Sequence, residues 1–326
     1  MQYTTLGRTG LKVSVAGLGG GGGSQLGLDR GKTRAEAQSL VRLAYDLGVT
    51  VFDTAHSYMT EEVLGEALQG IPRASVVLCT KHNVSPSGGR RELHSPAEMV
   101  EGLDLSLRRL RTDHVDVFYL HSLTLPNVDY ALNEIVPVLL REKAKGKFRF
   151  LGVTETPIKE LEHQGMRAAL KSDVFDVAMV AFQLLHQNAR TLVFPQTMSA
   201  DVGTVLMFAV RNIFAKWDHL RDTFQRLARE GKVPAHLAAK DNPLDFLIHT
   251  GGARSLIDAA YRFARHEPGV DLVLFGTGDP AHLRENITSI TAPALPESDL
   301  ALVRKLFGEL VGEGLDIPNR VRSKNA

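Results

Sequence analysis

Apolar runs of strand length recur along the chain and alternate with segments in which apolar residues have helical spacing. The runs are continuous and do not alternate with polar residues, which is typical of parallel strands that are buried on both faces. They predict eight strands, at 13–18, 49–53, 76–81, 115–121, 148–154, 177–183, 204–210 and 272–277.

Helix signals fill the intervals between these runs. Residues 33–36 and 95–98 have the spacing of a capping box, and apolar residues at helical spacing follow each of them. Asp279 and Pro280 predict the start of another helix. Because strand–helix alternation continues over the whole chain, we expect residues 1–326 to form a single α/β domain, a (β/α)8 TIM barrel.

Two segments extend beyond a bare barrel. Residues 211–240 predict a long helical insertion after the seventh strand, and residues 300–315 predict an extra C-terminal helix. Long loops on the catalytic face of a barrel usually shape the substrate pocket. A solvated helical insertion is the alternative interpretation.

Composition narrows the class of protein. Lys and Arg number 38 against 37 Asp and Glu, and no dense basic face is evident, so we expect no nucleic-acid partner. Cys79 is the only cysteine, which excludes an intrachain disulfide and favours a reducing compartment. The chain has no signal-peptide pattern and no apolar run long enough to cross a bilayer. These features predict a cytoplasmic protein without a membrane partner.

Chemistry-bearing residues occur at the ends of three consecutive predicted strands. Asp53, Lys81 and His121 occupy those ends, and Tyr58 follows Asp53 by five residues. The carboxyl ends of barrel strands converge on the active site. Lys81 could stabilise a Tyr58 phenolate, Asp53 could pair with Lys81, and His121 could hold a substrate oxygen or assist proton transfer. Each residue alone could serve packing or capping, but the set of four favours Tyr58 as a general acid in hydride transfer to a carbonyl.

Four motifs in the same order carry a family resemblance: YTTLGRTGLKVSVAGLG, GVTVFDTAHSYMTEEVLGEAL, LCTK and VDVFYLHS. They resemble the aldo-keto reductase superfamily over nearly the whole chain. The resemblance implies an N-terminal hairpin, a catalytic tetrad of Asp53, Tyr58, Lys81 and His121, and a monomer or weak homo-oligomer. It also implies NADP(H) as cofactor and a small-molecule carbonyl or alcohol as substrate.

The segment after the eighth predicted strand is a candidate nucleotide site. Glycines there let the backbone approach a ligand, and a helix N-terminus that follows suits a phosphate. The resemblance further implies that His282 and Asn286 face the adenosine 2′-phosphate and adenine. Together the residues that we expect to contact the cofactor are Gly20, Gly21, Thr154, Glu155, Phe182, Gly276, Thr277, Gly278, His282 and Asn286.

The chain departs from the family pattern at several of these positions. Many relatives have Lys at the position of Gly276 and Arg at that of His282, and both charges are absent here. NADP(H) remains the preferred cofactor, but the loss of these charges makes NAD(H) a possible one. On the sixth strand, Met179 stands where relatives have a Gln that binds the carboxamide. Phe182 stands where we expect the aromatic ring that stacks beneath the nicotinamide.

Three alternative functions can be weighed against the sequence: a Rossmann-type dinucleotide site, a metal-dependent hydrolase and a non-catalytic barrel. Gly17 to Gly22 formally match GxGxxG, the motif of a Rossmann dinucleotide site, but five consecutive glycines satisfy almost any glycine pattern. We interpret the run instead as a loop that passes close to substrate and cofactor. No His-x-His motif occurs, so a metal-dependent hydrolase is disfavoured and no metal is expected. A non-catalytic nicotinamide-binding barrel, acting as a redox sensor or regulatory subunit, fits the altered nicotinamide contacts but leaves the tetrad without a purpose.

Overall fold

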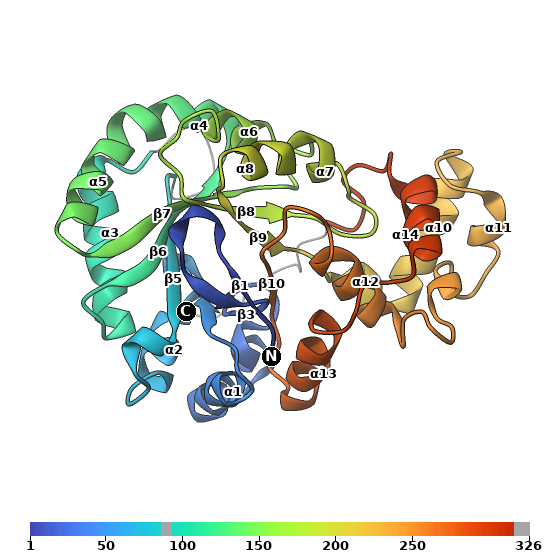
Figure 1. Ribbon diagram of the computed structural model, residues 1–326, viewed down its shortest axis with the longest axis horizontal. Helices are drawn as coiled ribbons and strands as arrows, with labels where there is room; N and C mark the ends of the chain where they lie inside the picture. The colour runs from blue at the N-terminus through green and yellow to red at the C-terminus, as the bar shows by residue number, and fades with distance from the viewer. Residues whose placement is uncertain (86–92, 316–326) are drawn as a thin grey trace, which may run out of the picture.

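A closed barrel of parallel strands forms the centre of the molecule, with helices packed around it (Figure 1). The computed structural model describes residues 1–85 and 93–315. The strands follow the order β10-β3-β4-β5-β6-β7-β8-β9, which confirms the predicted (β/α)8 barrel. Their bounds are β3 Ala16–Gly19, β4 Val51–Asp53, β5 Val77–Asn83, β6 Val115–Leu123, β7 Phe148–Glu155, β8 Val177–Ala181, β9 Gly203–Met207 and β10 Leu272–Phe275.

The first predicted strand is two strands in the structure. β1 (Tyr3–Thr5) pairs antiparallel with β2 (Lys12–Ser14), and the chain then bends at Val15 before β3 begins. Ser14 and Thr50 exchange hydrogen bonds between backbone N–H groups and hydroxyls, both at 2.9 Å, which join the end of the hairpin to the residue before β4. The prediction of one strand over 13–18 was therefore wrong, whereas the N-terminal hairpin implied by the family resemblance is present.

Strand residues alternate between the barrel interior and the layer under the helices. One buried cluster contains Val51, Cys79, Tyr119, Val177 and Met179, and the hairpin supplies apolar side chains that pack against it and close the amino end of the barrel. The intervening strand residues belong to a second cluster that includes the helices. Side chains alternate along a strand, so each strand residue faces either the barrel interior (inward parity) or the helices (outward parity). The parity of the last residues of a strand decides which of them face the mouth of the barrel.

The helices that cover the barrel begin largely where the capping signals predict. Thr33 and Ser95 each accept a hydrogen bond from the backbone N–H three residues later, so both capping boxes are present. The bounds are α1 Arg34–Asp46, α2 Glu61–Ala67, α3 Pro96–Leu110, α4 Leu125–Tyr130, α5 Val136–Ala144, α6 Gln164–Ala169, α7 Ala189–Leu192, α8 Phe194–Ser199, α9 Asn212–Ala215, α10 Trp217–Arg229, α11 Ala235–Ala238, α12 Leu256–Arg265, α13 Pro280–Ile290 and α14 Glu297–Phe307.

The predicted insertion after the seventh barrel strand is helical, and it packs against the C-terminal helix. Helices α9, α10 and α11 follow β9, and Figure 1 shows α10, α11 and α14 together at one side of the barrel. The rings of Phe224 and Phe307 join α10 to α14, with centroids 5.6 Å apart. The predicted bounds of 300–315 were wrong, because acidic residues in the first turn start α14 at Glu297 and the glycine-rich segment from Gly308 ends it.

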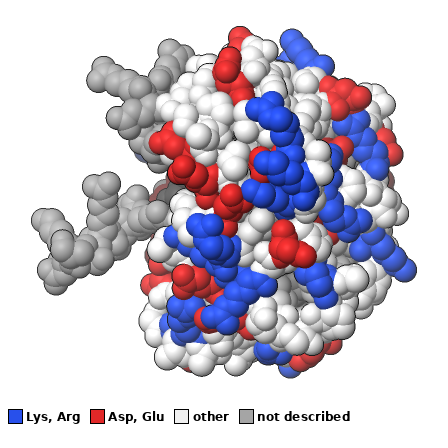
Figure 2. Space-filling view, turned by 90° about the vertical axis from the view of Figure 1, so that its left-hand side faces the viewer, with Lys and Arg blue, Asp and Glu red and all other residues white. Residues whose placement is uncertain are grey.

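The surface carries mixed charge. Figure 2 shows Lys and Arg side chains interspersed with Asp and Glu on the face that it presents. Within the described ranges, none of the helices combines the length and apolar character that a membrane span requires.

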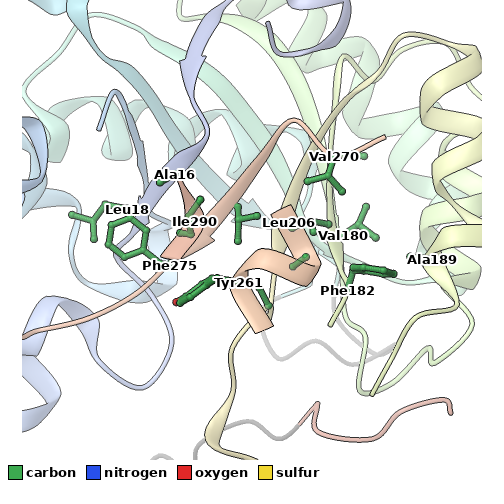
Figure 3. Packing of buried hydrophobic residues seen from close by; sticks show 14 of the residues in the cluster. Ala16, Leu18, Val180, Phe182, Ala189, Leu206, Tyr261, Val270, Phe275 and Ile290 are labelled. Atoms are coloured by element: carbon green, nitrogen blue, oxygen red, sulfur yellow. The ribbon is translucent and has the colours of Figure 1, made fainter. Parts of the chain in front are cut away.

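A substitution at Phe182 tests the packing between the barrel strands and the surrounding helices. The Phe182 side chain is fully buried and stacks on Phe263 with ring centroids 5.4 Å apart, and Figure 3 shows it among the buried side chains of the second cluster. We expect Phe182→Ala to lower the free energy of unfolding in urea by about 3–5 kcal/mol, because it leaves a cavity among these rings. The matched change at exposed Met198, Met198→Ala, should alter it by less than about 0.5 kcal/mol. Equal stability of the two variants would contradict this packing.

Candidate active site

The barrel brings the four predicted tetrad residues together at the carboxyl ends of its strands. Asp53 has the same inward parity as Val51 on β4, and Lys81 has that of Cys79 on β5. His121 likewise follows the inward-facing Tyr119 by two residues on β6. These side chains therefore share the mouth of the barrel, although they are far apart in the sequence.

A buried ion pair lies at the bottom of this mouth. Lys81 Nζ donates to Asp53 Oδ2 at 2.6 Å and to the Thr54 carbonyl at 2.8 Å, and both charged side chains are almost fully buried. Burial disfavours the ammonium, but the Asp53 carboxylate outweighs this effect and holds the pKa of Lys81 above its ordinary value. The ion pair thus keeps a positive charge fixed in the barrel.

Tyr58 lies above this charge. It belongs to the short 3-10 helix η3 (His56–Tyr58) after β4, and Lys81 Nζ is 4.8 Å from the centroid of its ring. The Tyr58 hydroxyl lies 3.3 Å from His121 Nε2. A fixed ammonium at this distance stabilises a phenolate, so the arrangement suits a phenol that gives up and regains a proton.

The glycine run after β3 makes room for the Tyr58 ring. A Cβ atom on Gly21 would lie 2.4 Å from Tyr58 Cε2, and one on Gly20 would lie 2.7 Å from Thr60 Oγ1. The absence of side chains at these two positions therefore sets how closely the loop approaches Tyr58.

His121 is held on its other side by Asn83. Its Nδ1 lies 3.1 Å from Asn83 Oδ1, and burial together with the charge of Lys81 lowers the pKa of His121 well below its ordinary value. The imidazole is consequently neutral near pH 7. We did not predict Asn83 as a site residue, although its position two residues after Lys81, with the same parity, is a signal in the sequence.

Strained backbone also marks this end of the barrel. Met59, Ser122 and Phe208 have φ values of 63°, 57° and 67°, and each directly follows Tyr58, His121 or strand β9. Such values are rare for residues other than glycine and cluster at functional sites. The Arg211 guanidinium lies 4.2 Å from the Phe208 ring centroid. Neither Phe208 nor Arg211 was predicted as a site residue. The signal available in the sequence was an aromatic residue directly after a strand.

The two residues predicted at the end of β7 point to opposite sides. Thr154 has inward parity, and its Oγ1 accepts a hydrogen bond from the Ser122 N–H at 2.8 Å. Glu155 points outward and is fully buried, where it accepts from His163 Nδ1 at 2.6 Å and from the Ala181 N–H at 2.8 Å. Both carboxylate oxygens are engaged by the protein, so the structure does not bring Glu155 to the mouth.

The parity of β8 likewise separates Phe182 from the site. Met179 points into the barrel with Val177, whereas Phe182 shares the outward parity of Val180 and packs under the helices. The expectation that Phe182 stacks beneath a nicotinamide ring is corrected by this placement, because its ring is buried against Phe263.

The turn between β10 and α13 is only partly as predicted. Gly276 is open, since a Cβ there would have no neighbour closer than 3.5 Å, whereas Gly278 packs directly on Gly27. Thr277 Oγ1 accepts from the Asp279 N–H at 3.0 Å. The Asp279 carboxylate accepts from the N–H groups of Ala281 and His282, at 2.7 and 3.1 Å. The helix N-terminus expected to take a phosphate is thus capped by the protein's own carboxylate.

His282 and Asn286 both lie on α13, in different environments. The His282 side chain is exposed in the first turn, whereas Asn286 is largely buried one turn later. Contact of either residue with a nucleotide remains a prediction.

The mouth retains one polar atom that a bound molecule could satisfy. Asp53 Oδ1 is buried and has no hydrogen-bond partner within residues 1–85 and 93–315. A ligand hydroxyl or amide would meet this need, and the side-chain-free backbone at Gly276 leaves space for an extended ligand. These features fit a nicotinamide nucleotide. In the same ranges, no group of three or more His, Cys, Asp or Glu side chains is arranged to hold a metal ion.

Comparison with known proteins agrees with this geometry. The profile of the aldo/keto reductase family matches residues 18–307. The chain belongs to this family. It is 28% identical to the aldo-keto reductase YhdN of Bacillus subtilis, over 92% of this chain and 91% of that protein. It is 34% identical to the L-galactose dehydrogenase of Arabidopsis thaliana over 165 residues, which cover 48% of this chain and 50% of that protein.

A solved structure of a Pseudomonas aeruginosa protein described as an aldo-keto reductase superposes with a TM-score of 0.63 at 26% identity. The match covers 88% of this chain and 93% of that one. As a member of this family, the protein is an oxidoreductase.

Gly21 tests the packing of the Tyr58 ring. We expect Gly21→Ala to lower kcat on the order of 100-fold, because the new methyl group displaces the ring of Tyr58, the predicted general acid, by about 1 Å. Gly19→Ala is the matched control, since its Cβ would meet nothing closer than 3.6 Å and it should leave kcat nearly unchanged. Steady-state kinetics of both variants, with circular dichroism to verify folding, make the comparison; an unaffected Gly21→Ala enzyme would refute the contact.

Proposed function

We propose that this protein is a nicotinamide-dependent oxidoreductase that interconverts an aldehyde or ketone and an alcohol, with NADP(H) as the preferred cofactor and NAD(H) as a possible one. The observation that carries the proposal is the position of Tyr58, whose hydroxyl is 3.3 Å from an imidazole and whose ring lies 4.8 Å from a buried ammonium. Proton transfer at a carbonyl oxygen requires such a group.

Each residue of the tetrad has a distinct task in the proposed reaction. A nicotinamide held at the mouth would supply the hydride in reduction and accept it in oxidation. Tyr58 donates its proton to the carbonyl oxygen, and Lys81 stabilises the phenolate that results. Asp53 holds Lys81 in place through the 2.6 Å ion pair. Neutral His121 holds the Tyr58 hydroxyl by a hydrogen bond until the carbonyl oxygen of the substrate replaces it as the acceptor of the Tyr58 proton.

The residues at the mouth divide between the two ends of the proposed cofactor. Near the reacting end, Gly20, Gly21 and Thr154 line the approach, and Asp53 Oδ1 offers an unused acceptor. At the nucleotide end, Gly276 supplies open backbone, and the other proposed contacts are Thr277, Gly278, His282 and Asn286. Because Asp279 caps α13, a phosphate at that helix must compete with a carboxylate, which weakens the electrostatic selection for NADP(H).

The similarity to an L-galactose dehydrogenase bears on the substrate. We therefore include sugars among the proposed substrates, beside simple aldehydes and ketones. Their hydroxyl groups would require polar partners near the mouth.

Tyr58→Phe tests the assignment of the acid. The variant should lose at least about 100-fold in kcat while its affinity for NADPH stays within about twofold, because the hydroxyl acts in proton transfer and does not hold the nucleotide. The measurements are NADPH oxidation with a panel of aldehydes, ketones and sugars, and NADPH binding followed by tryptophan fluorescence. A variant that retains the wild-type rate would show that Tyr58 is not the acid. Wild-type binding without any turnover would instead indicate a non-catalytic barrel.

His282→Arg tests the nucleotide end of the site. An added guanidinium should raise the ratio of NADPH to NADH affinity by about tenfold, since Arg pairs with a phosphate through charge and geometry. His236→Arg is the matched control, because it adds the same charge at an exposed position on α11. Titration of each variant with both nucleotides gives the ratios; identical ratios would place the 2′-phosphate away from His282.

A further inference from the structure

Asn83 and His121 face each other on neighbouring strands. They are partners in the parallel register of β5 and β6, directly beyond the pair formed by Lys81 and Tyr119. Both have inward parity, and Asn83 Oδ1 lies 3.1 Å from His121 Nδ1. Strand pairing, and not a mobile loop, therefore places the Asn83 amide beside the His121 imidazole.

The main chain of Asn83 is held from the outer side of the barrel. Its carbonyl accepts hydrogen bonds from His82 Nδ1 at 3.1 Å and from His94 Nδ1 at 2.8 Å. The His82 ring in turn lies so close to α3 that a Cβ on Gly102 would be 2.2 Å from its Cδ2. These contacts fix the main chain from which the Asn83 side chain extends toward His121.

A neutral imidazole carries one N–H, and the partner of one ring nitrogen determines the state of the other. Burial and the charge of Lys81 lower the pKa of His121, so the ring is neutral. If Asn83 Oδ1 accepts at Nδ1, the hydrogen resides there. Nε2 then has a free lone pair, and it lies 3.3 Å from the Tyr58 hydroxyl.

We infer that Asn83 is a positioning residue that holds His121 as the Nδ1–H tautomer and thereby presents Nε2 to the Tyr58 hydroxyl as an acceptor. Asn83 acts through His121 and not on the substrate. Its effect on rate rests on the proposed function, because it requires Tyr58 to act as the acid. The tautomer itself depends only on the geometry of the protein.

Nitrogen-15 NMR of the histidine-labelled full chain reads the tautomer directly. The signals of His121 are identified by their loss in His121→Gln. Wild-type His121 should show a protonated Nδ1 and an unprotonated Nε2. Asn83→Leu, which removes the acceptor at similar size, should lose this tautomer, whereas Asn83→Asp should keep it because a carboxylate also accepts at Nδ1.

Steady-state kinetics provide the second measurement. Asn83→Leu should lower kcat on the order of 10- to 100-fold, as is typical when the partner that orients a functional histidine is lost. The KM for the cofactor should change little, and Asn83→Asp should recover most of kcat. Asn83→Ala carries the same expectation as Asn83→Leu and replaces it if leucine prevents folding.

The outcomes separate this inference from the proposed function. An Nε2–H tautomer in the wild type, or an unchanged tautomer in Asn83→Leu and Asn83→Ala, would overturn the role of Asn83. A change in KM for the substrate with an unchanged tautomer would also overturn it, since Asn83 would then bind substrate. A tautomer that shifts as expected in a protein without turnover would support the inference and contradict the proposed function.

Discussion

The buried ion pair of Lys81 and Asp53 is the interaction on which the rest of the mouth depends. Two charges removed from water are costly unless they pair closely, and removing one partner of such a pair costs about 3–5 kcal/mol. The 2.6 Å contact and the Thr54 carbonyl meet this requirement. The barrel thereby holds a permanent positive charge beneath the Tyr58 ring, and burial together with this charge keeps His121 neutral.

Strand parity distributes the neighbouring residues around this pair. Asp53, Lys81, Asn83 and His121 face inward because each is an even number of residues from an inward-facing apolar residue on its own strand. Glu155 occupies the opposite parity and is satisfied in a buried network with His163. Adjacent residues such as Thr154 and Glu155 can therefore belong to different layers of the molecule.

Close approaches of backbone determine the shape of the mouth between these side chains. Gly21 lies against the Tyr58 ring, and Gly27 lies against Gly278, so the loop after β3 contacts both Tyr58 and the turn before α13. Gln25 and Leu26 adopt left-handed conformations in the same loop, with φ values of 41° and 59°. Strain of this kind persists only where surrounding packing enforces it, which here includes burial of the Leu26 side chain.

The sequence by itself determined the strand-helix alternation, the capped starts of α1 and α3, and which residue types stand at the ends of three consecutive strands. These properties are local, because apolar periodicity and capping depend on residues a few positions apart. Only the tertiary structure decided that Ser14 bonds to Thr50, that Phe182 and Glu155 face outward and that Asn83 meets His121. Each of these depends on strand register or on a partner distant in the chain, and no short-range pattern encodes that partner.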